Sequence, residues 1–259
     1  MLIRSKMAKL TIQSSFKTPD LKTVETVRSC LYEMNRVEKI KFTLIPSSIL
    51  EEIFRDLPKS APRLHILCIR PFSSRPALSI PDDFLYDTER LQRVELINCK
   101  ISWESRLLTG LTHLTLQVSL KANSSIIQVL QALQRMPALT DLHLKDSIPG
   151  DSEGLFAYDV VDLPCLRVLD ISSDVGSLTA VLRHIIFPSS ATLKLTCKES
   201  QSTQVDFSNF LSVLATKFLS TLVIRSLSFK LGVSDGYDND GLKFYLLTTA
   251  LIQDCFPSS

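Results

Sequence analysis

The sequence lacks several features that mark common classes of protein. Its longest apolar stretches, such as Phe244 to Ile252, are far shorter than the roughly 18 residues that a membrane-spanning helix needs. No apolar segment of signal-peptide length follows the basic start of the chain, and no basic run exceeds two residues. We therefore expect an intracellular protein, cytoplasmic or nuclear, that binds neither membrane nor nucleic acid.

Cysteine is also scarce and scattered. None of the six cysteines forms a CxxC pair or lies near a histidine at zinc-finger spacing. In an intracellular chain such residues are expected to be reduced thiols that behave as small apolar side chains. We accordingly predict no metal site and no cofactor. The cysteines are Cys30, Cys68, Cys99, Cys165, Cys197 and Cys255.

What the chain does have is a regular pattern of apolar residues. Hydrophobic residues make up 45% and charged residues 22%, with 29 basic and 27 acidic side chains well mixed, which is enough apolar material for a continuous core. A six-residue pattern recurs: apolar, two free positions, apolar, one free position, apolar. Its instances are Met7-Leu10-Ile12, Val37-Ile40-Phe42, Leu64-Leu67-Ile69, Leu91-Val94-Leu96, Leu111-Leu114-Leu116, Leu139-Leu142-Leu144 and Leu166-Leu169-Ile171. Two weaker or later instances are Leu193-Leu195, which has Ser190 in the first position, and Leu219-Leu222-Ile224.

The spacing of the pattern predicts the architecture. Successive first positions lie 30, 27, 27, 20, 28, 27, 24 and 29 residues apart, in the range of leucine-rich repeats. Because side chains alternate along a strand, Leu142 and Leu144 should enter the core while residues 141, 143 and 145 face the opposite side. A single unit cannot bury its apolar stripe alone, so neighbouring units should stack into a parallel ladder.

The segments between the strands show helical spacing. We expect helices over 23–34, 47–57, 124–136, 177–187 and 208–218, with capping residues Thr23, Ser48, Ser125, Ser177 and Asp206. The unit from Leu91 to Leu111 is too short for a full helix and should use a loop. Segments 71–81, 149–159 and 232–241 are rich in Pro, Gly, Ser and Asp and are expected to be surface loops.

The fold predicted from this pattern is α/β: a leucine-rich-repeat solenoid, a ribonuclease-inhibitor-like arc. Parallel strands should line its concave face, and helices and loops its convex face. We expect one domain over residues 1–259 with about nine repeats and a weaker capping region at 232–259. Stacked repeats of this kind offer a broad surface to a protein partner.

Several phrases resemble fungal F-box proteins with leucine-rich repeats. The resemblance covers roughly Arg4 to Phe229 and rests on Ala61-Pro62-Arg63-Leu64-His65-Ile66-Leu67, Leu91-Gln92-Arg93-Val94-Glu95-Leu96-Ile97-Asn98-Cys99, Leu107-Leu108-Thr109-Gly110-Leu111-Thr112-His113-Leu114, Leu130-Gln131-Ala132-Leu133-Gln134-Arg135-Met136-Pro137-Ala138-Leu139 and Leu163-Pro164-Cys165-Leu166-Arg167-Val168-Leu169. It implies a substrate receptor of an SCF ubiquitin ligase complex, in which an F-box binds a Skp-type adaptor and the repeats bind the target.

The start of the chain departs from that family. An F-box needs about three helices, and nothing before Met7 can form one. Binding to a Skp-type adaptor is therefore expected only if an F-box precedes this chain, while the target protein is unknown. The alternative is a free-standing leucine-rich-repeat scaffold or regulator with no ubiquitin link.

The candidate binding residues are polar side chains on the outward positions of the strands. Adjacent strands lie about 4.8 Å apart, so His113 should neighbour Asp141 and His143 should neighbour Asp170. The predicted partner-binding residues on the concave face are Arg93, Glu95, His113, Asp141, His143, Lys145, Asp170 and Lys194.

The same residues do not predict an enzyme. A histidine beside a carboxylate is the orienting half of a catalytic triad, but no serine elbow or reactive cysteine accompanies it. His113 and His143 lie on different rows with no evident third ligand, which disfavours a metal site. Three residues are given structural roles: Trp103 in packing, and Asn98 and Cys99 at a turn where leucine-rich repeats join neighbouring backbones.

Overall fold

The computed structural model describes most of the chain. The described residues are 8–16, 21–58, 60–72, 77–85, 87–117, 125–149, 159–198, 208–216, 224–230 and 242–248. Met7 and Asp206 lie outside them, as do Cys255 and the predicted loop 232–241.

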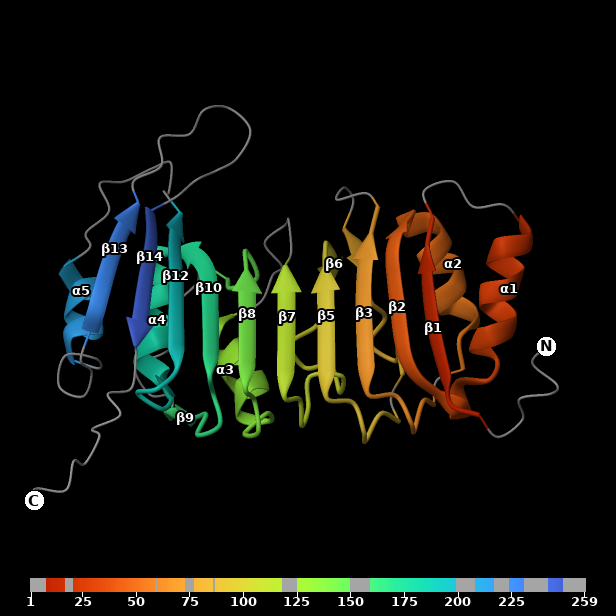
Figure 1. The fold of residues 1–259 in the computed structure, drawn as a ribbon, viewed down its shortest axis with the longest axis horizontal. Coiled ribbons are helices and arrows are strands. Elements are labelled where there is room, and N and C mark those ends of the chain that lie inside the picture. Colours follow the sequence, from red (N-terminus) through yellow and green to blue (C-terminus); the bar gives the residue numbers. More distant parts are fainter. Residues whose placement is uncertain are drawn as a thin grey trace, which may run out of the picture.

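A single large sheet forms the body of the molecule (Figure 1). Eight of its strands follow one another in space as they do in sequence, and each pairs in parallel with the next. The prediction of an α/β fold built on a parallel ladder is confirmed. These strands are β1 (Leu10–Ser15), β2 (Val37–Ile45), β3 (Ile66–Pro71), β5 (Arg93–Ile97), β7 (His113–Gln117), β8 (Asp141–Lys145), β10 (Val168–Asp174) and β12 (Thr192–Lys198).

The inward residues of these strands form two continuous apolar rows. The register pairs the second apolar residue of each unit with its counterpart in the next, and the same holds for the third. All are at most 2% exposed, so each row is sealed from water along its length. The first row is Ile40, Leu67, Val94, Leu114, Leu142, Leu169 and Leu193, and the second is Phe42, Ile69, Leu96, Leu116, Leu144, Ile171 and Leu195.

The first strand enters this ladder two residues later than the pattern predicts. Ile12, not Leu10, pairs with Ile40, and Ser14 pairs with Phe42. Ile12 is buried, whereas Leu10 is only partly buried. The reason is the period: Ile12 lies 28 residues before Ile40, close to the spacing of the other units, whereas Leu10 lies 30 before it.

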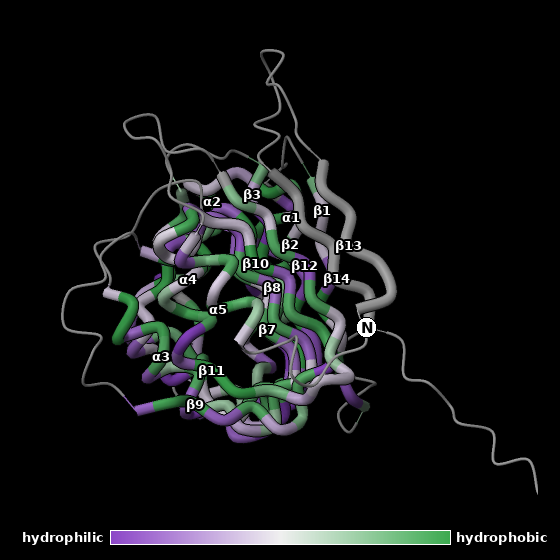
Figure 2. The backbone as a smooth tube through the Cα atoms, turned by 90° about the vertical axis from the view of Figure 1, so that its left-hand side faces the viewer, coloured by the Kyte–Doolittle hydropathy of each residue, from purple (hydrophilic) through white to green (hydrophobic). Residues whose placement is uncertain are grey.

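Helices cover one face of the sheet. They are α1 (Leu21–Leu31), α2 (Ser47–Asp56), α3 (Ile126–Gln134), α4 (Val175–His184) and α5 (Ser208–Leu214), with a short 3-10 helix η2 at Met34–Arg36. Figure 1 shows α2, α3 and α4 behind the strands, with α1 and α5 at the two ends of the sheet, and the end-on view of Figure 2 places the helices on one side. The core lies between this layer and the two apolar rows.

The helix starts agree only in part with the predicted capping residues. Ser125 caps α3, and its hydroxyl and the Gln128 side chain form a reciprocal capping box. Helix α4 begins earlier than predicted, because its N-cap is Asp174 and not Ser177. The Asp174 carboxylate accepts a hydrogen bond from the backbone N–H of Ser177. Ser48 lies inside α2, which starts after Pro46, and Thr23 lies inside α1.

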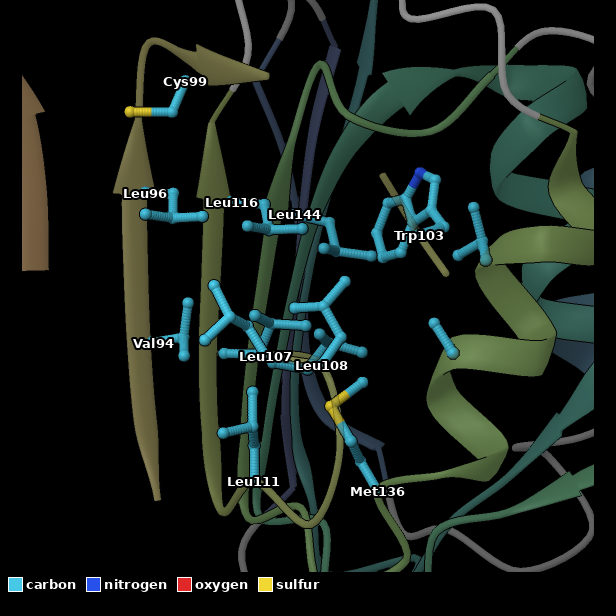
Figure 3. Packing of buried hydrophobic residues seen from close by; sticks show 14 of the residues in the cluster. Val94, Leu96, Cys99, Trp103, Leu107, Leu108, Leu111, Leu116, Met136 and Leu144 are labelled. Carbon is cyan, nitrogen blue, oxygen red and sulfur yellow. The ribbon is translucent and has the colours of Figure 1, made fainter. Parts of the chain in front are cut away.

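The short unit after β5 has no helix, as its length predicts. Leu107 and Leu108, both at most 1% exposed, fill the core from an irregular segment in place of a helix. In Figure 3 the indole of Trp103 lies between the sheet and the helix layer. The ring is only 4% exposed, so Trp103 packs in the core.

Two small parallel sheets connect neighbouring units on the helix side. One joins β4 (Leu78–Ser79) to β6 (Cys99–Lys100), and the other joins β9 (Val161–Asp162) to β11 (Ile185–Ile186). The prediction that 71–81 is a surface loop is wrong for its end, because Ala77, Leu78 and Ile80 are buried. These residues continue the core under the short unit.

The ladder changes direction at its C-terminal end. The strand beside β12 is β14 (Leu242–Thr248), which is antiparallel, and β13 (Ile224–Lys230) pairs with the far side of β14. The prediction of a ninth parallel rung at Leu219-Leu222-Ile224 is therefore wrong. The strand β14, from the predicted capping region 232–259, takes that place and pairs with β12 in antiparallel direction, although helix α5 lies between β12 and β13 in the sequence.

Candidate functional site

The face of the sheet opposite the helices, here called the open face, is covered by no helix among the described residues (Figures 1 and 2). Parallel sheets are usually buried on both faces and then consist of continuous apolar runs. Here the strands alternate instead: along β8, Leu142 and Leu144 are buried while Asp141 and His143 are half-buried and Lys145 is exposed. The open face therefore presents rows of polar side chains, while the other face of the same strands packs against the core.

One pair on this face joins β7 to β8. His113 Nε2 lies 3.2 Å from Asp141 Oδ2, and its Nδ1 lies 2.8 Å from the Thr112 hydroxyl oxygen. The Thr140 hydroxyl donates to the same carboxylate oxygen of Asp141 at 2.6 Å. Both ring nitrogens and the carboxylate thus have partners, and the predicted proximity of His113 and Asp141 is confirmed.

A second cluster joins β8, β10 and β12. Asp170 Oδ2 lies 3.5 Å from His143 Nδ1 and 3.4 Å from Lys194 Nζ, which confirms the predicted proximity of His143 and Asp170. Asp170 is only 8% exposed. Burial by itself would raise the pKa of its carboxyl, but the hydrogen bond from His143 and the charges of Lys194 and Lys145 hold that pKa below its usual value.

The N-terminal strands carry a third group, on β3 and β5. Arg70 Nη2 forms an ion pair with Glu95 Oε1. The hydrogen bond to Glu95 raises the pKa of Arg70 although its partial burial acts the other way. Burial, followed by the charge of Glu95, raises the pKa of the Cys68 thiol, which therefore stays neutral and apolar at physiological pH.

Three cations of the same region lack an acidic partner among the residues that the structure describes. Lys39 and Lys41 lie on β2 and Arg93 on β5, and no carboxylate lies within ion-pair distance of any of them. The register places Ile66 directly between Lys39 and Arg93, and Cys68 between Lys41 and Glu95. Half-buried Ile66 and buried Cys68 thus form a short apolar strip, in which Ile66 has a cation on both sides and Cys68 has Lys41 on one side and Glu95 on the other.

Part of this face was not predicted from the sequence. The structure places Arg93, Glu95 and the predicted residues of β7 to β12 on the open face. Four residues that were not predicted, Lys39, Lys41, Cys68 and Arg70, lie on the same face. The signal was present, because the hexads at Val37 and Leu64 assign these residues to outward positions just as the hexad at Leu91 assigns Arg93 and Glu95.

The predicted turn residues lie at the edge where β5 ends. Cys99 is fully buried, and its Sγ lies 3.4 Å from the Ile97 carbonyl oxygen and 3.8 Å from that of Ile69 on the neighbouring unit. Burial raises the pKa of Cys99 to about 12, so it remains a thiol that can donate to those carbonyls. The side chain thereby connects the backbones of two adjacent units.

Asn98 turns the chain at this edge with a positive φ of 56°. The same position of two other units, two residues after the third apolar residue, is held by Leu44 with φ 59° and Asp146 with φ 52°. Asn and Asp tolerate this left-handed conformation, but leucine does not. Leu44 is also 44% exposed, which makes it a strained residue with little packing in return.

The described residues contain no group of three or more His, Cys, Asp or Glu side chains placed to hold a metal ion. The Thr112 hydroxyl, the nearest candidate nucleophile to His113, lies 3.1 Å from the Gln92 carbonyl oxygen and donates to it. The same hydroxyl oxygen lies 2.8 Å from His113 Nδ1, and the direction of that hydrogen bond depends on the tautomer of the histidine. The open face is suited chemically to hydrogen bonds and ion pairs.

A cavity of about 450 Å³ opens on the helix side, between α2 and residues 79–85. Its lining includes Phe54 and Phe84, whose ring centroids lie 4.7 Å apart, together with Glu51 and Arg55. None of the residues predicted for partner binding lies there. The cavity is therefore separate from the open face.

Within the described part of the chain, no helix combines the length and apolar character needed to cross a membrane. Comparison of the chain with protein-family models and with curated proteins found no match.

Proposed function

We propose that the chain is a leucine-rich-repeat solenoid whose open face binds another protein. The observation that carries the proposal is the one-sided sheet: eight parallel strands packed on helices on one face, with rows of charged and polar side chains on the other. A rigid sheet presents such side chains with little loss of conformational entropy on binding. Curvature of the stack, with the open face concave, belongs to the same proposal.

The residues of the open face support binding rather than catalysis. Its two histidines are each held by a carboxylate, and the residues around them offer hydrogen-bond donors and acceptors in fixed register. We propose that this protein is not an enzyme and that it acts inside the cell, in the cytoplasm or nucleus. Its partner would be bound across several strands at once, since no single unit offers a large contact.

The resemblance to fungal F-box proteins extends this proposal to a role as an SCF substrate receptor. In that case the open face would bind the ubiquitination target, and an F-box encoded upstream of this chain would bind the Skp-type adaptor. Sequencing the complete transcript and testing its product for adaptor binding checks this part alone. A transcript without an F-box would leave a free-standing scaffold or regulator, with the same open face as its binding site.

Site-specific photo-crosslinking in cells of the source organism tests the binding proposal. A photoreactive residue replaces Gln13 or Thr192, both exposed on the open face, or the matched controls Glu25 on α1 and Gln131 on α3. We expect the two open-face positions to capture the same protein and the helix positions not to capture it. Equal capture from both faces, or none from the open face, would refute the proposal.

A further inference from the structure

The charges of the open face are distributed unevenly. Over β7, β8, β10 and β12 the described acidic groups are matched within the protein: Asp141 by His113, and Asp170 by His143 and Lys194. Over β2, β3 and β5 the face carries four cations, Lys39, Lys41, Arg70 and Arg93, and one carboxylate, Glu95. That carboxylate is paired to Arg70.

This surplus surrounds an apolar centre. The register sets Lys39, Ile66 and Arg93 side by side on three adjacent strands, a span of about 10 Å at the usual strand spacing. Lys41 lies two residues along β2 from Lys39, about 7 Å away in an extended strand. Side chains at positions i and i+2 of an extended peptide have the same separation, so two alternate carboxylates of such a peptide can face the two lysines.

We propose that the open face over β2, β3 and β5 is the docking site for an acidic, extended segment of the partner protein. Its carboxylates pair with Lys39, Lys41 and Arg93, and an apolar side chain of the segment covers Ile66. This assignment rests on the proposed function of the open face and names the chemistry of its partner. Arg70 and Glu95, which already neutralise each other, border the site on one side.

The physical case for this site is that the three cations are not compensated by the protein itself. An unpaired cation on a rigid surface keeps its field for an incoming anion, and several together steer an oppositely charged partner. The apolar strip of Ile66 and Cys68 adds contact area that a purely ionic surface lacks.

A labelled synthetic peptide of alternating Glu and Leu is the probe, compared with its Gln-and-Leu counterpart by fluorescence anisotropy at low salt. We expect the Glu peptide to bind more tightly than the Gln peptide and to weaken as salt screens the charges. The double variant Lys39→Gln/Lys41→Gln should weaken its binding about tenfold or more. The matched control Lys22→Gln, an exposed lysine on α1 on the opposite side of the sheet, should leave it within about twofold.

Several results would overturn this assignment. They are equal binding of the Gln peptide, an equal loss in Lys22→Gln, or displacement of the Glu peptide by a single-stranded RNA oligonucleotide at lower concentration than by unlabelled Glu peptide. Photo-crosslinking separates the two proposals. If Thr192 still captures its partner when Lys39 and Lys41 are Gln, the open face binds a partner elsewhere and only the acidic-segment assignment fails. If the open face captures no partner, the proposed function itself fails.

Discussion

The two halves of the open face lie over the same core but differ in how far their charged side chains are paired. Over β2 to β5, here the N-terminal half, Lys39, Lys41 and Arg93 have no described acidic partner. Over β7 to β12, the C-terminal half, Asp141 and Asp170 are each held by histidine or lysine. Both halves share the two continuous inward rows, so the fold does not depend on how the outward charges are arranged.

This difference indicates that the outward charges of the C-terminal half contribute to stability, whereas those of the N-terminal half are available for binding. In the C-terminal half, the contacts of Asp141 with His113 and of Asp170 with His143 and Lys194 leave less charge for a partner. In the N-terminal half the positive charges of Lys39, Lys41 and Arg93 are not neutralised by a described acidic side chain. These cations repel one another, and the burial of the apolar rows has to outweigh that repulsion. Substitutions in the two halves should therefore have opposite signatures, one in stability and the other in binding.

The largest expected effect comes from the shared rows. Leu67→Ala and Leu142→Ala should each lower the free energy of unfolding by about 2–5 kcal/mol, because each removes a fully buried side chain of the first apolar row and leaves a cavity. Urea denaturation followed by circular dichroism measures this. Thr115→Ala, on the outward side between Leu114 and Leu116, is the control and should change it by under about 0.5 kcal/mol. A loss confined to one half would show that the rows are not continuous.

Removing the charge of Asp170 should be the next largest effect. Asp170→Asn leaves Lys194 and His143 without their carboxylate in a nearly buried position, which should cost about 1–2 kcal/mol of stability. Asp141→Asn is the comparison, since the Asp141 side chain is 30% exposed and solvent weakens its pair. Equal losses in the two variants, measured by urea denaturation, would contradict the assigned difference in burial.

Acidification should remove the same contribution from the native protein. The pKa of Asp170 in the folded chain lies below its ordinary value of 3.8, so the ionised form stabilises the fold. Its contribution is complete above that ordinary value and is lost as pH falls through the lower folded-state pKa. The difference in unfolding free energy between the native protein and Asp170→Asn should thus be constant near neutrality and shrink below about pH 4. A difference that grows on acidification would contradict the sign.

Relief of backbone strain in the N-terminal half should have a smaller effect of opposite sign. Leu44 has a φ of 59° and an exposed side chain, so Leu44→Gly should raise stability by about 1 kcal/mol. Leu44→Ala is the control, because it keeps the Cβ atom that clashes in this conformation and should give no gain. Thermal unfolding distinguishes the two, and a gain in both variants would indicate another cause.

The smallest expected effect is on the stability of the cationic half. Lys39→Gln/Lys41→Gln removes no described ion pair, so the free energy of unfolding should stay within about 0.5 kcal/mol of the native value. A loss above about 1 kcal/mol would mean that these lysines serve the fold rather than a partner.

Much of the fold could be predicted because the repeat is local. The hexads from Val37 to Leu195 place seven strands, their direction and their buried residues, and the 20-residue spacing predicts the missing helix after Leu96. The neighbours His113 and Asp141 followed from the same register. Where the hexad weakens, prediction failed: Leu10 took the position of Ile12, and the hexad at Leu219 suggested a parallel rung that the chain does not form.

The sequence by itself thus determined which residues of each unit point inward, because strand alternation and burial act within a few residues of one another. Only the tertiary structure decided which outward charges are neutralised. Lys39, Ile66 and Arg93 are 27 residues apart in sequence at each step yet are neighbours across the strands, and whether a cation finds a carboxylate depends on the side-chain positions of adjacent units. It also decided the antiparallel end of the sheet, since pairing of β14 with β12 is a contact between distant segments that no local pattern encodes.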